Sequence, residues 1–264
     1  MQFRRLQPQY ADTREIAEVT NLILNGKTNN TGVFDLNTSW ATQTVIYNER
    51  ISADSKIILV PFSDAAETDT APYGEFESFT TQLAPSAGNT AVVTYDSTHE
   101  ADGVYLDPVN TSRIYVRNAG LYNVIFTLQL ANANNDSEYA DVWFRVNGSD
   151  LAETGRRFGL PARKSTGDPS HLTGTSNHVI DLNAGDYIEI AGATSSTLVS
   201  LETFPASTSP YTRPAIAAAQ TTVVYTAPFS LDNVYVSAQQ NGQATISHFA
   251  NNTSNKQYGY VIIG

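Results

Sequence analysis

The sequence predicts an all-β protein with one short helix near its N-terminus. Three observations carry this prediction. Apolar residues alternate with polar ones at a period of two over most of the chain after Gly26. Turn-forming pairs such as Asn147-Gly148 and Asn241-Gly242 separate these segments at close intervals. No alternation of helices with strands is present, so we expect a β-sandwich or a jelly roll.

The helix is predicted at the N-terminus, where the apolar spacing changes to three and four residues. Asp12 is a suitable N-cap, Glu15 follows three residues later, and Asn25-Gly26 supplies the C-terminal stop. Because a helix of about 12 residues is marginal alone, its apolar stripe must be covered by the β domain, by a partner or by its own symmetry copies.

All of the predicted strands follow this helix, and no second helix is predicted between them. They lie at 33–37, 42–48, 55–62, 89–95, 103–107, 112–117, 121–130, 139–147, 178–182, 186–192, 197–204, 221–226, 233–238, 243–249 and 258–264. Polar stretches at 134–138, 163–169 and 204–214 are predicted to be exposed loops.

Composition and charge exclude several classes of protein. The formal net charge is −11, which disfavours binding to nucleic-acid phosphates. The chain has no cysteine, so it has no disulfide, thiolate metal site or cysteine nucleophile. No apolar run reaches membrane-spanning length and the N-terminus does not resemble a signal peptide. We therefore expect no membrane insertion, synthesis in a cytosol, and release by lysis if the protein leaves the cell.

Residues that could carry catalysis do not form a recognised pattern. The four histidines are not spaced as metal ligands, and no nucleophile elbow, Walker loop or dinucleotide fingerprint is present. The acidic pairs could be read as glycosidase carboxylates, but residues two apart in a strand share one face, and Glu75 and Glu77 are then a solvated edge. The acidic pairs are Glu75/Glu77, Asp136/Glu138 and Asp186/Glu189. Because none of these patterns is a recognised catalytic site, the sequence predicts no enzyme.

Calcium is the one cofactor that the residues allow, because Asp and Asn cluster at 102–107 and 132–136. No complete calcium-loop string exists, and a polar loop is the alternative. We otherwise expect no cofactor and no metal.

The aromatic residues suggest a binding face. In the segment 139–147, alternation places Val142, Phe144 and Val146 on one face and Trp143 with Arg145 on the other. One face belongs to the core, and the other is either a contact between subunits or a platform for sugar rings.

Two motifs resemble a known family at this point. The run Ala119-Gly120-Leu121-Tyr122 leads into a long strand, and the segment 182–190 has the pattern Leu-x-x-Gly-Asp-x-Ile-x-Ile. Both are similar to the jelly-roll heads of many phage structural proteins, which resemble the tumour necrosis factor and complement globular-head superfamily. The usual aromatic two positions after the tyrosine is replaced by Val124, with Phe126 close by.

A second resemblance is split along the chain. Residues 25–67 and 233–264 look like the two halves of a small β module common in phage genomes. We therefore expect a jelly-roll head inserted in a loop of a small β base. The expected parts are an N-terminal arm and helix at 1–26, a split base at 27–72 and 228–264, and a head at 73–227.

These resemblances imply a homotrimeric component of a bacteriophage virion, because heads of this superfamily assemble in three-fold rings. The expected function is a fibre-like or spike-like appendage that presents its head to a host-surface glycan or protein. A capsid decoration or cement protein is the alternative, and a glycan depolymerase is a remote one. Expected partners are other copies of the chain and other virion proteins.

Two sets of residues are candidates for these roles. The candidates for the trimer contact or core are Tyr122, Phe126, Trp143, Phe144 and Tyr187. The candidates for attachment to an acidic neighbouring protein, with a solvated arm as the alternative, are Arg4, Arg5, Arg14, Ile16, Val19 and Ile23.

Overall fold

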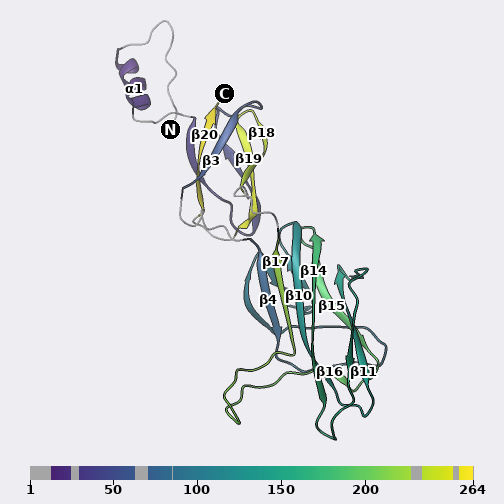
Figure 1. Cartoon of the computed structure of the whole chain (residues 1–264). Helices are drawn as coiled ribbons and strands as arrows, with labels where there is room; N and C mark the ends of the chain where they lie inside the picture. Colours follow the sequence, from purple (N-terminus) through teal and green to yellow (C-terminus); the bar gives the residue numbers. More distant parts are fainter. Residues whose placement is uncertain are drawn as a thin grey trace. The chain divides into compact units, whose positions relative to one another are not determined.

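The computed structural model describes residues 13–24, 30–62, 71–84, 86–226, 234–251 and 256–263. Within these ranges the chain forms one helix and twenty strands, so the all-β prediction is confirmed (Figure 1). The chain divides into two compact units. We call residues 71–229 the head, and residues 1–70 with 230–264 the base. The sequence pattern placed these seams at 73 and 227.

The head is built from two facing seven-stranded sheets, named here after a central strand of each. The β10 sheet contains β4 (Tyr73–Ser78), β5 (Gln82–Leu83), β7 (Ser97–Asp102), β10 (Gly120–Asn132), β14 (Ser170–Leu182), β16 (Val199–Leu201) and β17 (Ala219–Tyr225). The β15 sheet contains β6 (Ala91–Val92), β8 (Val104–Leu106), β9 (Ile114–Val116), β11 (Glu138–Val146), β12 (Ser149–Asp150), β13 (Arg156–Leu160) and β15 (Tyr187–Thr194).

The strand order identifies the head as a jelly roll. The main strands of one sheet run in the order β4-β17-β10-β14, and those of the other run in the order β9-β15-β11-β13. The pairings are antiparallel, and neighbouring strands such as β4 and β17 lie far apart in sequence. This arrangement is the double-sheet jelly roll that the turn spacing and the alternation predict.

The core of the head is one continuous cluster between the two sheets. It contains 22 buried residues, among them Phe76, Tyr122, Phe126 and Phe144. Phe126 packs on Phe144 with ring centroids 5.3 Å apart. Val124, two positions after Tyr122, is also fully buried.

The base is a smaller two-sheet sandwich assembled from both ends of the chain. The β20 sheet has the order β1 (Thr31–Asp35), β20 (Gln257–Ile263) and β3 (Lys56–Pro61). The β19 sheet has the order β18 (Tyr235–Gln240), β19 (Gln243–Asn251) and β2 (Ala41–Tyr47). Its main core has six buried residues, among them Ile46, Ile246 and Tyr260. Both halves of the split module therefore contribute strands to each sheet.

The helix α1 (Thr13–Leu24) lies where the sequence predicts it. Its N-cap and stop residues, Asp12 and Asn25-Gly26, lie outside the described residues. No helix in the described part of the chain is long and apolar enough to cross a membrane.

The list of predicted strands lacks several strands of the head, namely β4, β5, β7, β12, β13 and the first half of β14. The inward positions of β14 hold Gly174 and Ser176 instead of large apolar residues. A Cβ atom on Gly174 would lie only 3.0 Å from the ring of Phe158, so that ring on β13 already fills the space above the glycine. The alternation is present, but a residue from another strand supplies the apolar bulk.

Candidate binding surfaces of the head

The head has one end where the chain enters and leaves, and a free opposite end. At the first end the amide of Tyr225 donates a hydrogen bond to the carbonyl of Pro72, at 2.9 Å. At the other end Ala219 pairs with Ser78. The segment between β16 and β17 leaves the sandwich at this free end.

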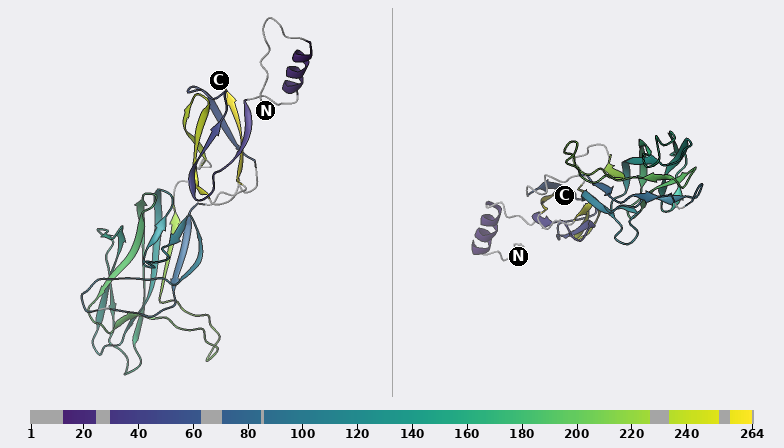
Figure 2. Two further views of the ribbon diagram at one scale, coloured as in Figure 1. Left: turned by 180° about the vertical axis from the view of Figure 1, so that it is seen from behind. Right: turned by 90° about the horizontal axis from the view of Figure 1, so that it is seen from below.

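That segment forms a projecting hairpin, which we call the arm (residues 204–216; Figures 1 and 2). Phe204 pairs with Ile216 through two backbone hydrogen bonds of 3.0 and 2.8 Å, and Ser207 pairs with Arg213 through two more. The guanidinium of Arg213 also donates to the carbonyls of Pro205 and Pro214. Because these bonds lie within the hairpin, the arm has a defined shape before it meets any partner.

The root of the arm is attached to the β10 sheet by side chains. The rings of Phe204 and His171 pack edge to face with centroids 5.4 Å apart. His171 Nε2 lies 2.7 Å from a carboxylate oxygen of Glu202. Near the tip, Tyr211 is 66% exposed. The arm therefore presents an aromatic side chain to solvent from a fixed root.

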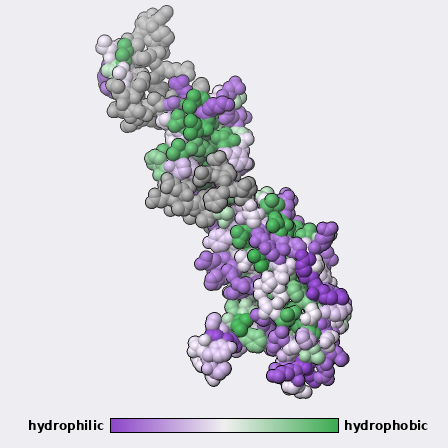
Figure 3. Space-filling model, in the orientation of Figure 1, coloured by the Kyte–Doolittle hydropathy of each residue, from purple (hydrophilic) through white to green (hydrophobic). Residues whose placement is uncertain are grey.

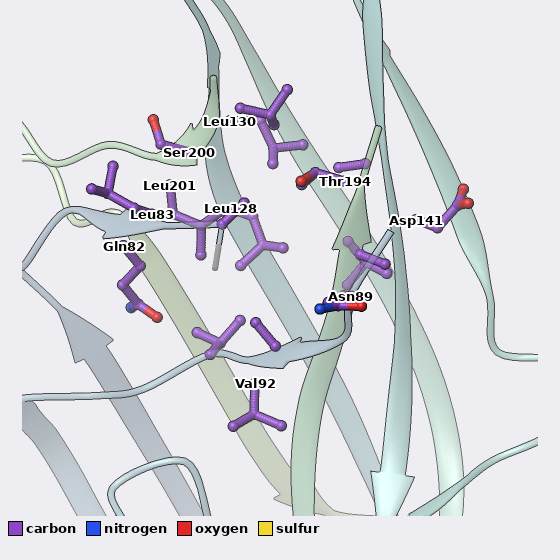
Figure 4. Close-up of a pocket in the computed structure, with 18 residues that line it drawn as sticks. Gln82, Leu83, Asn89, Val92, Leu128, Leu130, Asp141, Thr194, Ser200 and Leu201 are labelled. Atoms are coloured by element: carbon purple, nitrogen blue, oxygen red, sulfur yellow. The ribbon is translucent and has the colours of Figure 1, made fainter. Parts of the chain in front are cut away.

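An apolar slot opens between the two sheets at the same free end (Figure 4). Its volume is about 100 Å³. Leu128, Leu130 and Leu201 line one wall, and Val142 belongs to the opposite sheet. Two polar residues at its rim, Asp141 and Gln82, already have partners. Asp141 forms an ion pair with Arg157 at 2.7 Å, and its carboxylate points away from the slot in Figure 4.

The side chain of Gln82 is held by hydrogen bonds. Its amide nitrogen donates to the carbonyl of Thr94 at 2.8 Å, and its oxygen accepts from the Thr94 amide. The slot therefore suits an apolar group of the size of a single ring or a short aliphatic chain.

Aromatic and arginine side chains cover one end of the outer face of the β15 sheet. Tyr105 and Tyr115 stack with ring centroids 5.4 Å apart, and Tyr187 follows at 5.1 Å from Tyr115. Arg117 lies over Tyr105 and Arg113 over Tyr187. Protein groups already occupy these ring faces, so this row is unsuited to stacking on sugar rings. It instead stabilises the sheet by ring and cation–π contacts.

The predicted contact residues fall into two groups. Tyr122, Phe126 and Phe144 are fully buried in the core. The Tyr122 hydroxyl donates to the carbonyl of Asn118 at 2.7 Å. These three residues therefore lie between the sheets of one head, away from any surface that another subunit could reach.

Trp143 and Tyr187, in contrast, lie on the outer face of the β15 sheet. The Trp143 indole donates to Asp150 at 2.7 Å, and Arg145 forms an ion pair with the same carboxylate at 2.5 Å. The hydrogen bonds from Arg145 and Trp143 lower the pKa of Asp150. The structure confirms the predicted alternation, with Trp143 and Arg145 on one face of the strand and Phe144 on the other.

The attachment candidates are only partly described. Arg4 and Arg5 lie outside the described residues. Arg14, Ile16, Val19 and Ile23 lie in α1, where Ile16 is exposed.

The histidines and acidic pairs are placed differently from expectation. His171 and His178 lie on one strand, β14, and not across a loop. The seven-residue spacing puts them on opposite faces of that strand. Glu75 and Glu77 lie on β4, which pairs with β17 and β7 and is not an edge. Gln220 donates a hydrogen bond to Glu75.

Residues of both loops proposed for calcium form hydrogen bonds within the protein. Asp107 accepts hydrogen bonds from the amides of Val109 and Asn110, which lower its pKa. Asn132 is buried and braces its loop through Asp136 and Pro161. Within the described ranges, no three His, Asp or Glu side chains lie close enough to hold a metal ion.

The arm and the slot are the features that the sequence reveals least. The arm had a signal, the prolines of the predicted loop 204–214, but that signal does not specify a hairpin. The slot has none, because its lining comes from strands far apart in sequence.

Comparison with known proteins yields a likeness of fold. No protein-family model matches the chain, and no curated protein matches it. Among solved structures, the globular domain of a zebrafish complement 1qA protein is similar, with 11% sequence identity and a TM-score of 0.33. The match covers 58% of this chain and 96% of that one. Nothing about ligands, partners or assembly follows from a likeness of this kind.

Proposed function

We propose that this chain is a non-enzymatic structural protein of a bacteriophage particle, a homotrimeric fibre-like or spike-like appendage. The N-terminal part and the base attach it to the particle, where other virion proteins are its partners. The head binds a glycan or protein of the host surface. Assembly takes place in the host cytoplasm, and lysis releases the particle.

One observation carries the binding role. The chain enters and leaves the head at the Pro72 and Tyr225 end, whereas the arm and the slot lie at the free end. An inserted domain tethered at one end presents its opposite end to a partner. A preformed arm with an exposed Tyr211 suits recognition, since aromatic residues dominate binding energies and an ordered hairpin loses little entropy on binding.

The trimer is supported by the motifs at 119–122 and 182–190, which resemble heads that assemble in three-fold rings. Non-enzymatic function is supported by the lack of a recognised catalytic pattern in the sequence. Capsid decoration is the second candidate, because a two-unit β protein also suits a cement that binds shell proteins.

Electron microscopy of purified particles with a labelled antibody tests the proposal. We expect label at a projecting appendage and few copies per particle. Label spread over the shell, with hundreds of copies, favours the cement. Label on no particle contradicts a virion role altogether.

The binding role is tested by adsorption of particles that carry Tyr211→Ala. We expect adsorption to fall by about tenfold or more, as for the loss of an aromatic hot spot. Tyr47→Ala is the matched control, because Tyr47 is also strongly exposed but lies in the base. Equal adsorption by the two variants contradicts recognition through the arm. Release of reducing ends from host polysaccharide by the purified chain would support the depolymerase instead.

A further inference from the structure

The base carries an exposed apolar surface on the outer side of its β20 sheet. We call it the apolar face, and it consists of Val33, Ile58, Val60, Phe62, Val261 and Ile263. Each of the five other than Val261 is exposed by about half or more, and Phe62 by 65%. Figure 3 shows apolar residues gathered over this unit.

The strand register makes this surface continuous. Val33 and Val60 both pair with Gly259, one from each side. In the next row Ile58 pairs with Val261. Since Gly259 has no side chain, the centre of the face is low, and Phe62 lies beside it at 3.7 Å from the position of a Cβ atom.

Charged groups are confined to the two ends of the face. Asp35 lies at one end and accepts a hydrogen bond from Gln257 at 3.1 Å. Lys56 lies at the other end, paired with Ile263. The rows between them contain no ionisable side chain.

The outer side of the second base sheet is different. Val45, Tyr47 and Tyr235 are exposed there, but each pairs with a polar residue, namely Thr245, Gln243 and Ser247. Ser247 donates to Ser237 across two strands at 2.8 Å. One outer side of the base therefore suits water, whereas the other exposes clustered aliphatic groups, as surfaces that bind other proteins do.

The chemistry of the face selects its partner. Aliphatic side chains offer no hydrogen bonds to a glycan and no cations to a phosphate, so the partner is an apolar protein surface. The chain itself has a net charge of −11, so copies repel one another wherever charged surfaces meet. The uncharged rows of this face let copies approach without that cost, and three such faces can converge around a three-fold axis.

We propose that the base units of neighbouring copies associate through the apolar face. This inference rests on the proposed function, because it names the surface that holds the homotrimer together. The head then contributes less to the association, and its free end stays available for binding.

Cross-linking tests the proposal directly, because the chain has no native cysteine. We expect the full-length Val60→Cys variant to form covalent dimers on oxidation or with a short bis-maleimide. Val179→Cys, at a strongly exposed position on the head, is the matched control and is expected to remain uncross-linked. Cross-linking of the control alone overturns the inference. If Val60→Cys forms an oligomer but does not cross-link, the inference is also overturned. The chain's own helix covering the face would give this result.

Dissociation on dilution provides the second test. Val33→Thr combined with Val60→Thr keeps side-chain shape and strand preference but removes apolar contact. We expect the protein concentration at which half of the oligomer has dissociated to rise by about tenfold or more. The control pair, Val179→Thr with Val224→Thr on the head, is expected to leave it unchanged.

The outcomes separate this inference from the proposed function. A wild-type chain whose mass is that of a monomer at every concentration contradicts the trimer itself. A wild-type trimer that only the head pair weakens leaves the trimer standing and overturns the base contact. Circular dichroism of each variant shows whether it folds. If a threonine variant does not fold, the cross-linking of the cysteine variants decides whether the base contact exists.

Discussion

The head and the base are both two-sheet sandwiches, but they fill their interiors to different degrees. The head has one continuous cluster of 22 buried residues. The base has a cluster of six and a second of two, and exposes aliphatic side chains on one outer side. Because stability grows with buried apolar area, we infer that the head is the self-sufficient unit and that the base gains stability from association.

The largest effect that we expect is from the core of the head. Phe126→Ala removes a ring that packs on Phe144 and Phe158, and is expected to lower the free energy of unfolding of the head by about 3–5 kcal/mol. Chemical denaturation of the head, residues 71–229, measures this change. An exposed substitution, Val179→Ala, serves as the control, and a similar loss from both would contradict a single dominant core.

In the base, Ile246→Ala is expected to cost about 2–4 kcal/mol, because Ile246 is fully buried. If the base depends on association, this loss unfolds the base in dilute solution while the head stays folded. Denaturation of the full chain then shows two transitions, of which only the first moves. One shared transition for both units would remove the distinction between them.

A glycine of the head sharpens the comparison at the level of the backbone. Gly120 has φ = +147°, and a Cβ atom there would lie 2.3 Å from the ring of Tyr225. Gly120→Ala is expected to destabilise the head by about 2–4 kcal/mol, from strain and the displaced ring. Gly185 has φ = +87° with open space around it, so Gly185→Ala should cost only about 1 kcal/mol. Equal melting temperatures for the two variants would contradict this packing.

The smallest effect that we expect is a dependence of head stability on pH. Burial, and then the nearby charge of Arg156, lower the pKa of His178 below its usual 6.5. The unfolded chain therefore binds a proton more readily, so stability falls as the pH drops below 6.5 and levels off below the folded-state pKa. His178→Gln, which does not titrate, should flatten this part of the profile in thermal denaturation. An unchanged profile assigns the dependence to other groups.

The alternation of residues determined much of this protein in advance. It placed Phe144 inside and Trp143 outside, and it located the helix α1 and most strands of both units. Alternation has this power because successive strand residues point to opposite faces, whichever strands become neighbours.

Only the tertiary structure decided which apolar surfaces are covered by other strands and which stay exposed. The ring of Phe158 supplies the bulk missing at Gly174, the slot joins residues of six strands, and the apolar face forms where β1 and β3 flank β20. Each depends on contacts between residues that are remote in sequence, and a local pattern contains no information about them. The sequence by itself therefore determined the class of fold and the facing of side chains in the strands that it located, whereas the pairing of distant strands decided where the molecule is left open to partners.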